Sequence, residues 1–298
     1  MPLWVFIAIG GYFLGAVTKV IDKVLLVSVI SDPLVFTFFT GIVSVFAIVL
    51  VPFGLEPVGP IIALSAFVCG ASFVAGLFFF FKALKKFEIS RVVPIVAGVA
   101  PFATLIFSYW LLGERLALGH IFAVVLLVIG GVLLSIDPSV RRKFQRELFM
   151  LSCISALFLS INLVATKIVF SHTPFINGFI WTRAGIILAT LSLLLLPDFW
   201  SALKNTRRPR PKNISFFLLT KAIGALSLIA ISYALARGQA SVIHALGGFE
   251  YVSAFILSLV ASNFWPRVFD ENKSPAALGI KFLGTLFLSA ALAILSFQ

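Results

Sequence analysis

Ten apolar stretches, each about as long as a membrane-spanning helix, follow one another along the 298-residue chain. A helix needs about 20 mostly apolar residues to cross a hydrocarbon core of about 30 Å. Hydrophobic residues make up 61% of the chain and charged residues 11%, which is more apolar surface than a water-soluble fold could bury. We therefore predict an all-α membrane protein with spans over roughly residues 3–21, 33–51, 60–81, 93–112, 118–136, 149–169, 174–196, 214–235, 242–262 and 276–297.

The spans leave no room for a soluble catalytic domain, which excludes most enzymes. The sequence has no Walker loop after a strand, no Cys/His cluster with metal spacing, and no HExxH or GxSxG motif. We expect no enzymatic activity, no cofactor and no metal. Cys69 and Cys153 both fall inside spans, so we interpret them as small buried hydrophobic residues rather than a disulfide.

The formal net charge of +12 raises the possibility of nucleic-acid binding, but the positions of the basic residues argue against it. Sixteen of the 23 Lys and Arg residues lie in the odd-numbered connections between spans, and only Arg115 and Arg237 lie in even-numbered ones. Basic residues collect in short cytoplasmic loops. The odd connections should therefore face the cytoplasm, with both termini outside and anionic lipid headgroups as partners of the basic loops.

A weak internal repeat divides the ten spans into two sets of five. With a shift of 151 residues KALKKFEIS (82–90) falls on YALARGQAS (233–241), and with a shift of 160 residues the stretch 118–136 falls on 278–296. A unit with an odd number of spans that occurs twice must be inverted across the membrane, an architecture found in secondary transporters. We predict two inverted five-helix repeats, residues 1–140 and 141–298, around a central cavity.

The first copy carries a distinctive set of residues: Ala83-Leu84 before the third connection, Pro94 and Pro101 in the fourth span, Gly113-Glu114-Arg115 after it, and Gly119 with Gly130-Gly131 in the fifth span. This pattern resembles the EamA-type repeat of the drug/metabolite transporter (DMT) superfamily. The resemblance implies a transporter whose spans one, three, four, six, eight and nine surround the cavity. It also implies cytoplasmic termini, against the charge pattern. The second copy has Ala245 and Val252 in place of the two prolines.

Pro94 and Pro101 each remove a backbone donor, about two turns apart and on nearly the same face. Together with Gly98 they either bend the fourth span around the cavity, as the resemblance implies, or are tolerated kinks. Gly247-Gly248 is a flexible pair in the ninth span. Glu114, which follows Gly113 at a helix end, is interpreted as a packing or capping residue.

Ionisable side chains at membrane depth cost about 2.5–3.5 kcal/mol on insertion scales, so each is a functional candidate. Glu250 is the only acidic residue well inside a predicted span, and we expect a proton-coupling group, a counter-ion of the cavity or half of a structural ion pair. Arg183, midway along the seventh span, should pair with Glu250 or with an anionic substrate group. Lys221 and Lys19 are further cavity candidates, with snorkelling to the interface as the alternative.

The other candidates are polar or aromatic. His244 could relay protons or simply pack through a hydrogen bond, and Tyr251 and Trp181 could stack on an amphipathic substrate or on other aromatic rings. Asn162, Asn177 and Tyr233 complete this group. Lys167 and Lys281 lie near span ends, where snorkelling is the better interpretation.

The sequence thus predicts a multi-pass protein of a prokaryotic plasma membrane that moves a small organic solute by alternating access, as a monomer or homodimer. The excess of basic over acidic residues in the spans favours a solute with a carboxylate or phosphate. Proton-coupled export of a neutral or cationic amphiphile through Glu250 and flipping of a lipid-linked substrate are alternatives. A membrane scaffold without transport activity is a further one.

Overall fold

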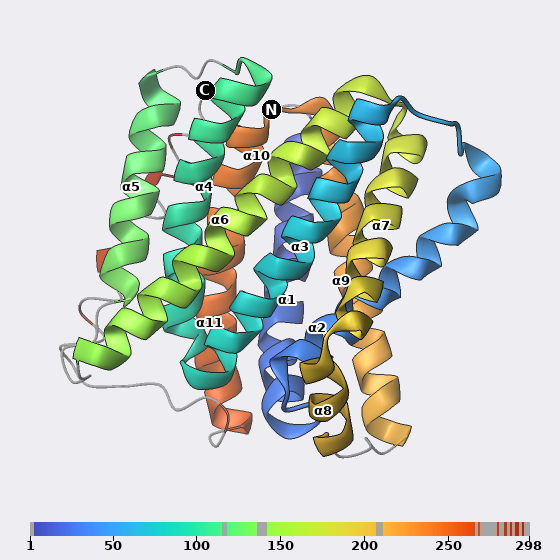
Figure 1. Ribbon diagram of the computed structural model, residues 1–298. Coiled ribbons are helices and arrows are strands. Elements are labelled where there is room, and N and C mark those ends of the chain that lie inside the picture. The colour runs from blue at the N-terminus through green and yellow to red at the C-terminus, as the bar shows by residue number, and fades with distance from the viewer. Residues whose placement is uncertain are drawn as a thin grey trace.

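The computed structural model describes residues 3–114, 118–135, 142–206 and 211–265, with single residues 268, 279, 283, 284, 287, 290, 291 and 294. Within these residues the chain forms helices and no strand (Figure 1). The helices are α1 (Leu3–Ser28), α2 (Pro33–Ile42), η1 (Val43–Phe53), α3 (Pro60–Lys86), α4 (Ile89–Leu112), α5 (Leu118–Ser135), α6 (Arg142–His172), α7 (Phe175–Ser192), η2 (Leu193–Leu195), α8 (Pro197–Asn205), α9 (Pro211–Arg237), α10 (Ala240–Leu246) and α11 (Gly248–Phe264).

Eight helical segments of the described chain are long and apolar enough to cross a membrane. They coincide with the predicted spans one to four and six to nine, and a shorter apolar helix, Ile121–Gly130, lies in the fifth. Large apolar side chains such as Phe46, Trp110 and Leu195 point outward, as expected of a surface that faces lipid. The tenth predicted span, 276–297, lies outside the described residues apart from single positions.

Helix α1 is longer than the sequence predicted. It runs to Ser28 rather than 21, so Asp22 and Lys23 lie inside the helix, and both are buried. Arg91, counted above with the third connection, is likewise buried in the first turn of α4. Two of the sixteen basic residues used for orientation are therefore buried in the helical bundle.

Three predicted spans are not single α-helices. The seventh consists of α7 and the short 3₁₀-helix η2. The second begins as α2 and continues as the 3₁₀-helix η1, which is rich in Val and Ile and contains Pro52, residues that disfavour the α-helical form. The ninth is divided at Gly247 into α10 and α11. A Cβ at Gly247 would come within 2.8 Å of the carbonyl oxygen of His244 and 3.3 Å of the Tyr12 ring, so a glycine suits this break.

The two prolines of the fourth span do not divide it, because α4 is a continuous helix from Ile89 to Leu112 that contains both Pro94 and Pro101. It ends at Gly113, whose φ of 65° is left-handed and whose backbone N–H bonds the carbonyl of Ser108. Glu114 Oε1 then accepts a hydrogen bond from the backbone N–H of Ala240, the first residue of α10, at 2.8 Å. The end of α4 thus caps the start of α10.

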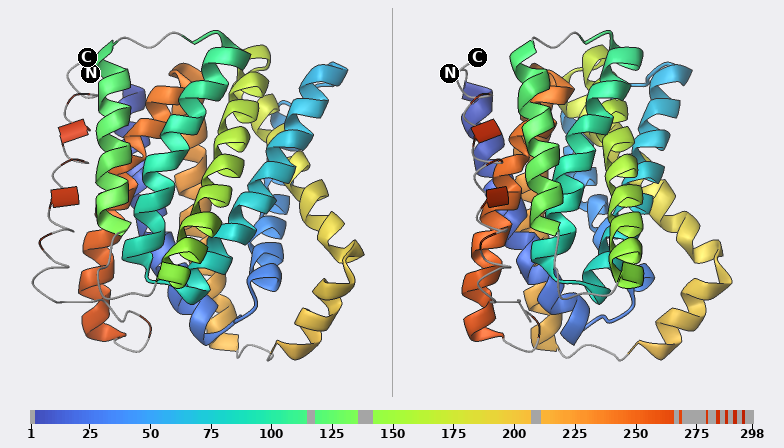
Figure 2. Two further views of the ribbon diagram at one scale, coloured as in Figure 1. Left: turned by 60° about the vertical axis from the view of Figure 1, so that its left-hand side comes forward. Right: turned by 90° about the vertical axis from the view of Figure 1, so that its left-hand side faces the viewer.

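The helices pack in two similar groups. α1 lies against α9 and α11, while α6 lies against α3 and α4, and α5 packs on α4 at the edge of the bundle (Figures 1 and 2). α3 also crosses α7 so closely that a Cβ at Gly70 would overlap the backbone carbonyl of Gly185, and one at Gly185 would overlap that of Ala66. The backbones of α3 and α7 are therefore in direct contact at this crossing.

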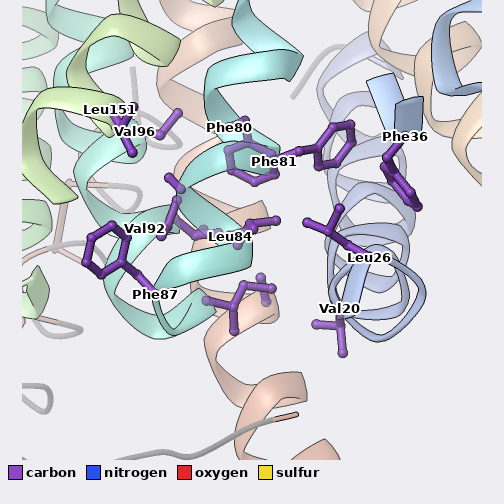
Figure 3. Close-up of a cluster of buried hydrophobic side chains, with 14 of the residues drawn as sticks. Val20, Leu26, Phe36, Phe80, Phe81, Leu84, Phe87, Val92, Val96 and Leu151 are labelled. Carbon is purple, nitrogen blue, oxygen red and sulfur yellow. The ribbon is translucent and has the colours of Figure 1, made fainter. Parts of the chain in front are cut away.

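The largest apolar cluster joins α1, α2, α3, α4, α6 and α11. Figure 3 labels phenylalanines of this cluster from α2 (Phe36) and α3 (Phe80 and Phe81), with Phe87 directly after α3. Phe36 and Phe81 meet edge to face with ring centroids 4.7 Å apart. This cluster surrounds the charged groups described next.

Candidate functional site

Four charged side chains form two ion pairs across the polar face of α1, and we call them the paired-charge cluster. Lys19 Nζ of α1 lies 2.8 Å from Glu250 Oε2 of α11, and Asp22 Oδ1 of α1 lies 2.7 Å from Lys221 Nζ of α9. Lys19 and Asp22 are three residues apart, which places them on one helix face. One face of α1 thus binds both α9 and α11 through charge.

The surroundings of the paired-charge cluster are aromatic and tightly packed. The Lys221 ammonium lies 4.7 Å from the ring centroid of Phe36, 5.0 Å from that of Phe217 and 5.9 Å from that of Phe81. At the other pair, the Glu250 carboxylate occupies the space that a Cβ on Gly15 would need. Ring faces and a bare glycine backbone allow these charges to approach α1 closely.

A second polar group, the Arg183 cluster, lies between α3, α6 and α7 and consists of Arg183, Cys69, Asn162 and Thr166. Asn162 Nδ2 donates to the Cys69 carbonyl oxygen at 3.0 Å, and Thr166 Oγ1 lies 3.1 Å from Cys69 Sγ. Arg183 comes two residues before the Gly70–Gly185 crossing, and its guanidinium lies 4.9 Å from the ring centroid of Phe179.

Arg183 has no acidic partner among the described residues. Its side chain is 6% exposed, and its Nε is buried without a hydrogen-bond partner. The predicted pair with Glu250 is therefore wrong, since Glu250 binds Lys19. An arginine keeps its charge under all ordinary conditions, so this guanidinium is a buried cation. Arg91 is the other buried arginine with unpartnered nitrogens, Nε and Nη2.

Two further lysines hold helix ends. Lys23 Nζ donates to the carbonyl oxygens of Leu84 and, at 2.7 Å, Phe87 at the end of α3. Lys167 Nζ of α6 donates to Leu235 at 2.9 Å and Gly238 at 2.7 Å at the end of α9. Lys167 is half-buried and caps the end of α9, because the last carbonyls of a helix lack intrahelical partners. Its snorkelling to the membrane interface stays a prediction. Lys281 lies outside the described residues.

The remaining predicted residues have local partners. His244 Nδ1 lies 2.5 Å from Thr104 Oγ1, Trp181 Nε1 donates to the Glu56 carbonyl at 3.0 Å, and Asn177 accepts from the Glu56 N–H at 3.1 Å. Tyr233 lies under the Arg237 guanidinium at 3.7 Å. Gly98 and Gly248 are buried in α4 and α11, and the side chain of Tyr251 lies outside the described residues.

Asp22 is the residue that the sequence reasoning missed, because the predicted first span ended at 21. The run Lys19-Val20-Ile21-Asp22-Lys23 contained the signal: opposite charges three residues apart, followed directly by the apolar stretch Val24–Val27. A helix that continues through such a run buries the charges on one face. Among the described residues no three His, Cys, Asp or Glu side chains are placed to bind a metal ion.

An apolar pocket of about 310 Å³ lies between α3, α4 and α6. Its lining includes Val68, Ile161 and Ala165, which are the chain neighbours of the polar residues Cys69, Asn162 and Thr166. The pocket and the Arg183 cluster are therefore built from the same turns of α3 and α6.

In the described part of the chain, eight apolar helical segments long enough to cross a membrane define an integral multi-pass membrane protein. Residues 2–136 match the EamA-like transporter family, which is part of the DMT superfamily. The family is one of transporters, in agreement with the expectation that this protein is not an enzyme.

Comparison of whole structures adds a likeness in fold. The protein is similar to one of known crystal structure, described only as "Crystal structure of protein", with 18% sequence identity, a TM-score of 0.67 and coverage of 98% of both chains. At this identity the likeness shows the fold alone. No curated protein matches the chain in sequence.

Proposed function

We propose that this protein is a secondary-active transporter of a small organic anion, with Arg183 as the group that binds the carboxylate or phosphate of the solute. The observation that carries the proposal is the buried Arg183 guanidinium, which forms no salt bridge within the described chain. An unpaired charge in a poorly hydrated interior is costly, and an anionic ligand would relieve that cost.

Four lysines of the helical bundle, two of them buried and two half-buried, differ from Arg183 in having oxygen partners. Lys19 and Lys221 each bind a carboxylate, and Lys23 and Lys167 bind backbone carbonyls. The guanidinium also presents a planar fork of donors that matches a carboxylate or phosphate better than a lysine does. Arg183 is therefore the best anion receptor among the predicted site residues.

Alternating access between two inverted repeats is the mechanism that the packing favours. In an inverted repeat each of the first five spans has a counterpart among the second five. The counterpart of α1 is then α6, and that of α3 is α9. The contact of α1 with α9 then corresponds to that of α6 with α3. The carbonyls that the two lysines bind are also related by the repeat. Leu84 and Phe87, bound by Lys23, are separated by the 151-residue shift from Leu235 and Gly238, bound by Lys167.

Ligand stabilisation of the purified protein tests the proposal. A ligand that binds only the folded state stabilises it by about 2.7 kcal/mol at a hundredfold excess over its Kd. The panel contains sugar phosphates, nucleotides and organic acids, set against neutral amino acids and cationic amphiphiles. We expect the anions to raise the melting temperature of the wild type, and Arg183→Gln to lose that shift.

Arg237→Gln is the matched control, because it removes the same charge from an exposed position at the end of α9. It should keep the anion-dependent shift. Anion stabilisation that survives in Arg183→Gln, or shifts produced only by neutral or cationic compounds, would contradict the proposal. The latter result would favour proton-coupled export through Glu250.

The apolar pocket between α3, α4 and α6 favours one second candidate, a lipid-linked substrate whose chain occupies the pocket while its anionic head reaches Arg183. Movement of a fluorescent lipid phosphate across the bilayer of proteoliposomes, lost in Arg183→Gln, would support this alternative over a water-soluble solute.

A further inference from the structure

We propose that the Asp22–Lys221 pair is a proton-binding site in which Asp22 gains and loses the proton. Only the role of this proton in transport rests on the proposed transport function. The proton-binding site itself does not. Both residues are 7% exposed, and they join α1 to α9 through a single contact of 2.7 Å. Neither the family match nor the Arg183 cluster assigns any role to Asp22.

The aromatic rings around Lys221 are the first reason for this assignment. Three rings lie within 5.9 Å of the ammonium, and they attract a cation whether or not a carboxylate is present. When Asp22 takes up a proton, Lys221 keeps this part of its stabilisation. At the other pair, the Phe80 ring centroid lies 5.7 Å from the Lys19 ammonium.

The balance of charges around Asp22 is the second reason. Lys221 faces it from α9 and Lys19 from its own helix, α2 and α3 present the Phe36 and Phe81 rings, and α11 contributes Glu250, which binds Lys19. The neighbouring Lys23 binds the carbonyls at the end of α3. The paired-charge cluster is neutral, and one proton gives it a single positive charge.

The chemical step is simple. A proton from water forms an O–H bond with one carboxyl oxygen of Asp22, and it returns to water when that bond breaks. Lys221 stays an ammonium throughout. Protonation replaces the ion pair between α1 and α9 by a hydrogen bond from the Lys221 ammonium to an uncharged carboxyl group, which is weaker. The proton thereby loosens the α1–α9 contact, which elsewhere includes the hydrogen bond from Ser227 Oγ to the Gly11 carbonyl at 2.7 Å.

Infrared difference spectroscopy of the reconstituted protein tests the inference without any solute. Spectra recorded between alkaline and acidic buffer should contain, beside the bands of the other Asp and Glu residues of the chain, a separate carbonyl stretch from protonated Asp22. We expect Asp22→Asn to lose this band and Glu250→Gln, the matched variant of the neighbouring pair, to keep it. Because no transported solute is present, failure here is distinct from failure of the anion proposal for Arg183.

Asp22→Asn leaves Lys221 without its carboxylate, so this variant could fail to fold. The double variant Asp22→Asn/Lys221→Met removes both charges with little change in volume and serves in its place. Absence of this separate carbonyl band from the wild type, or survival of that band without Asp22, would overturn the inference. So would loss of the band in both Asp22→Asn and Glu250→Gln, because the proton would then belong to both carboxylates.

Discussion

Single lysine side chains close the C-terminal ends of two helices in this protein. Lys23→Met and Lys167→Met keep the apolar stem and remove the ammonium, so two backbone carbonyls lose their donor in each case. Hydrogen bonds to charged groups contribute about 1.5–3 kcal/mol each. We expect each variant to melt at a clearly lower temperature than the wild type in detergent.

Lys204→Met is the control for these two variants, since Lys204 is exposed in the last turn of α8. Its melting temperature should equal that of the wild type. Equal melting temperatures for all three variants would show that the lysine contacts do not hold the ends of α3 and α9.

The rule that charges inside spans are candidates found Glu250, Arg183 and Lys221 from the sequence, and all three are buried. Their partners could not be predicted, because a pairing such as Lys221 with Asp22 joins residues 199 positions apart. Asp22 was not identified as a charge inside a span, because apolar composition alone does not fix where a helix ends. The unpartnered state of Arg183 likewise became visible only with its surroundings.

At the scale of whole helices, the crossing of α3 and α7 gives the sharpest prediction. A methyl group at Gly70 or Gly185 would overlap backbone atoms of the other helix, which cannot move aside as a side chain can. Gly70→Ala and Gly185→Ala should therefore strongly destabilise the protein, as seen in melting temperature and in the yield of monodisperse protein.

Gly10→Ala in α1 is the matched control, because nothing lies within 4 Å of its added Cβ. Alanine in place of a helical glycine contributes about 0.5–1 kcal/mol of stability, so this variant should melt at or above the wild-type temperature. Unchanged stability in Gly70→Ala would mean that the two helices do not meet backbone to backbone.

Helix positions were predictable because long apolar runs leave few alternatives in a bilayer. The internal form of the helices was less so. The Val- and Ile-rich end of the second span forms the 3₁₀-helix η1, and the ninth span breaks at Gly247, whereas two prolines leave α4 unbroken. Each outcome depends on neighbouring helices, such as the Tyr12 hydroxyl that donates to the Ile243 carbonyl at 2.6 Å beside the break.

For the whole molecule, the basic residues predict that both termini lie outside the cell membrane. Removing Lys23 and Arg91 from the loop count leaves the excess in the odd connections large, since both are buried in helices. We expect an affinity tag at either terminus to be cleaved by protease added to intact cells. Cleavage only after the membrane is opened would contradict the charge-based orientation and favour the usual orientation of the relatives.

The direct backbone contact of α3 with α7 also means that the helix interfaces of this molecule differ in how easily they can move. Because the backbones of α3 and α7 are in direct contact, these two helices form one rigid unit and should not slide or roll against each other. The junction of α1 with α9 and α11 is instead fastened by ion pairs and a hydroxyl, all of which are side-chain attachments that can be released and remade. A conformational change during transport should therefore leave the α3–α7 pair unchanged and take place at the interfaces of α1 with α9 and α11.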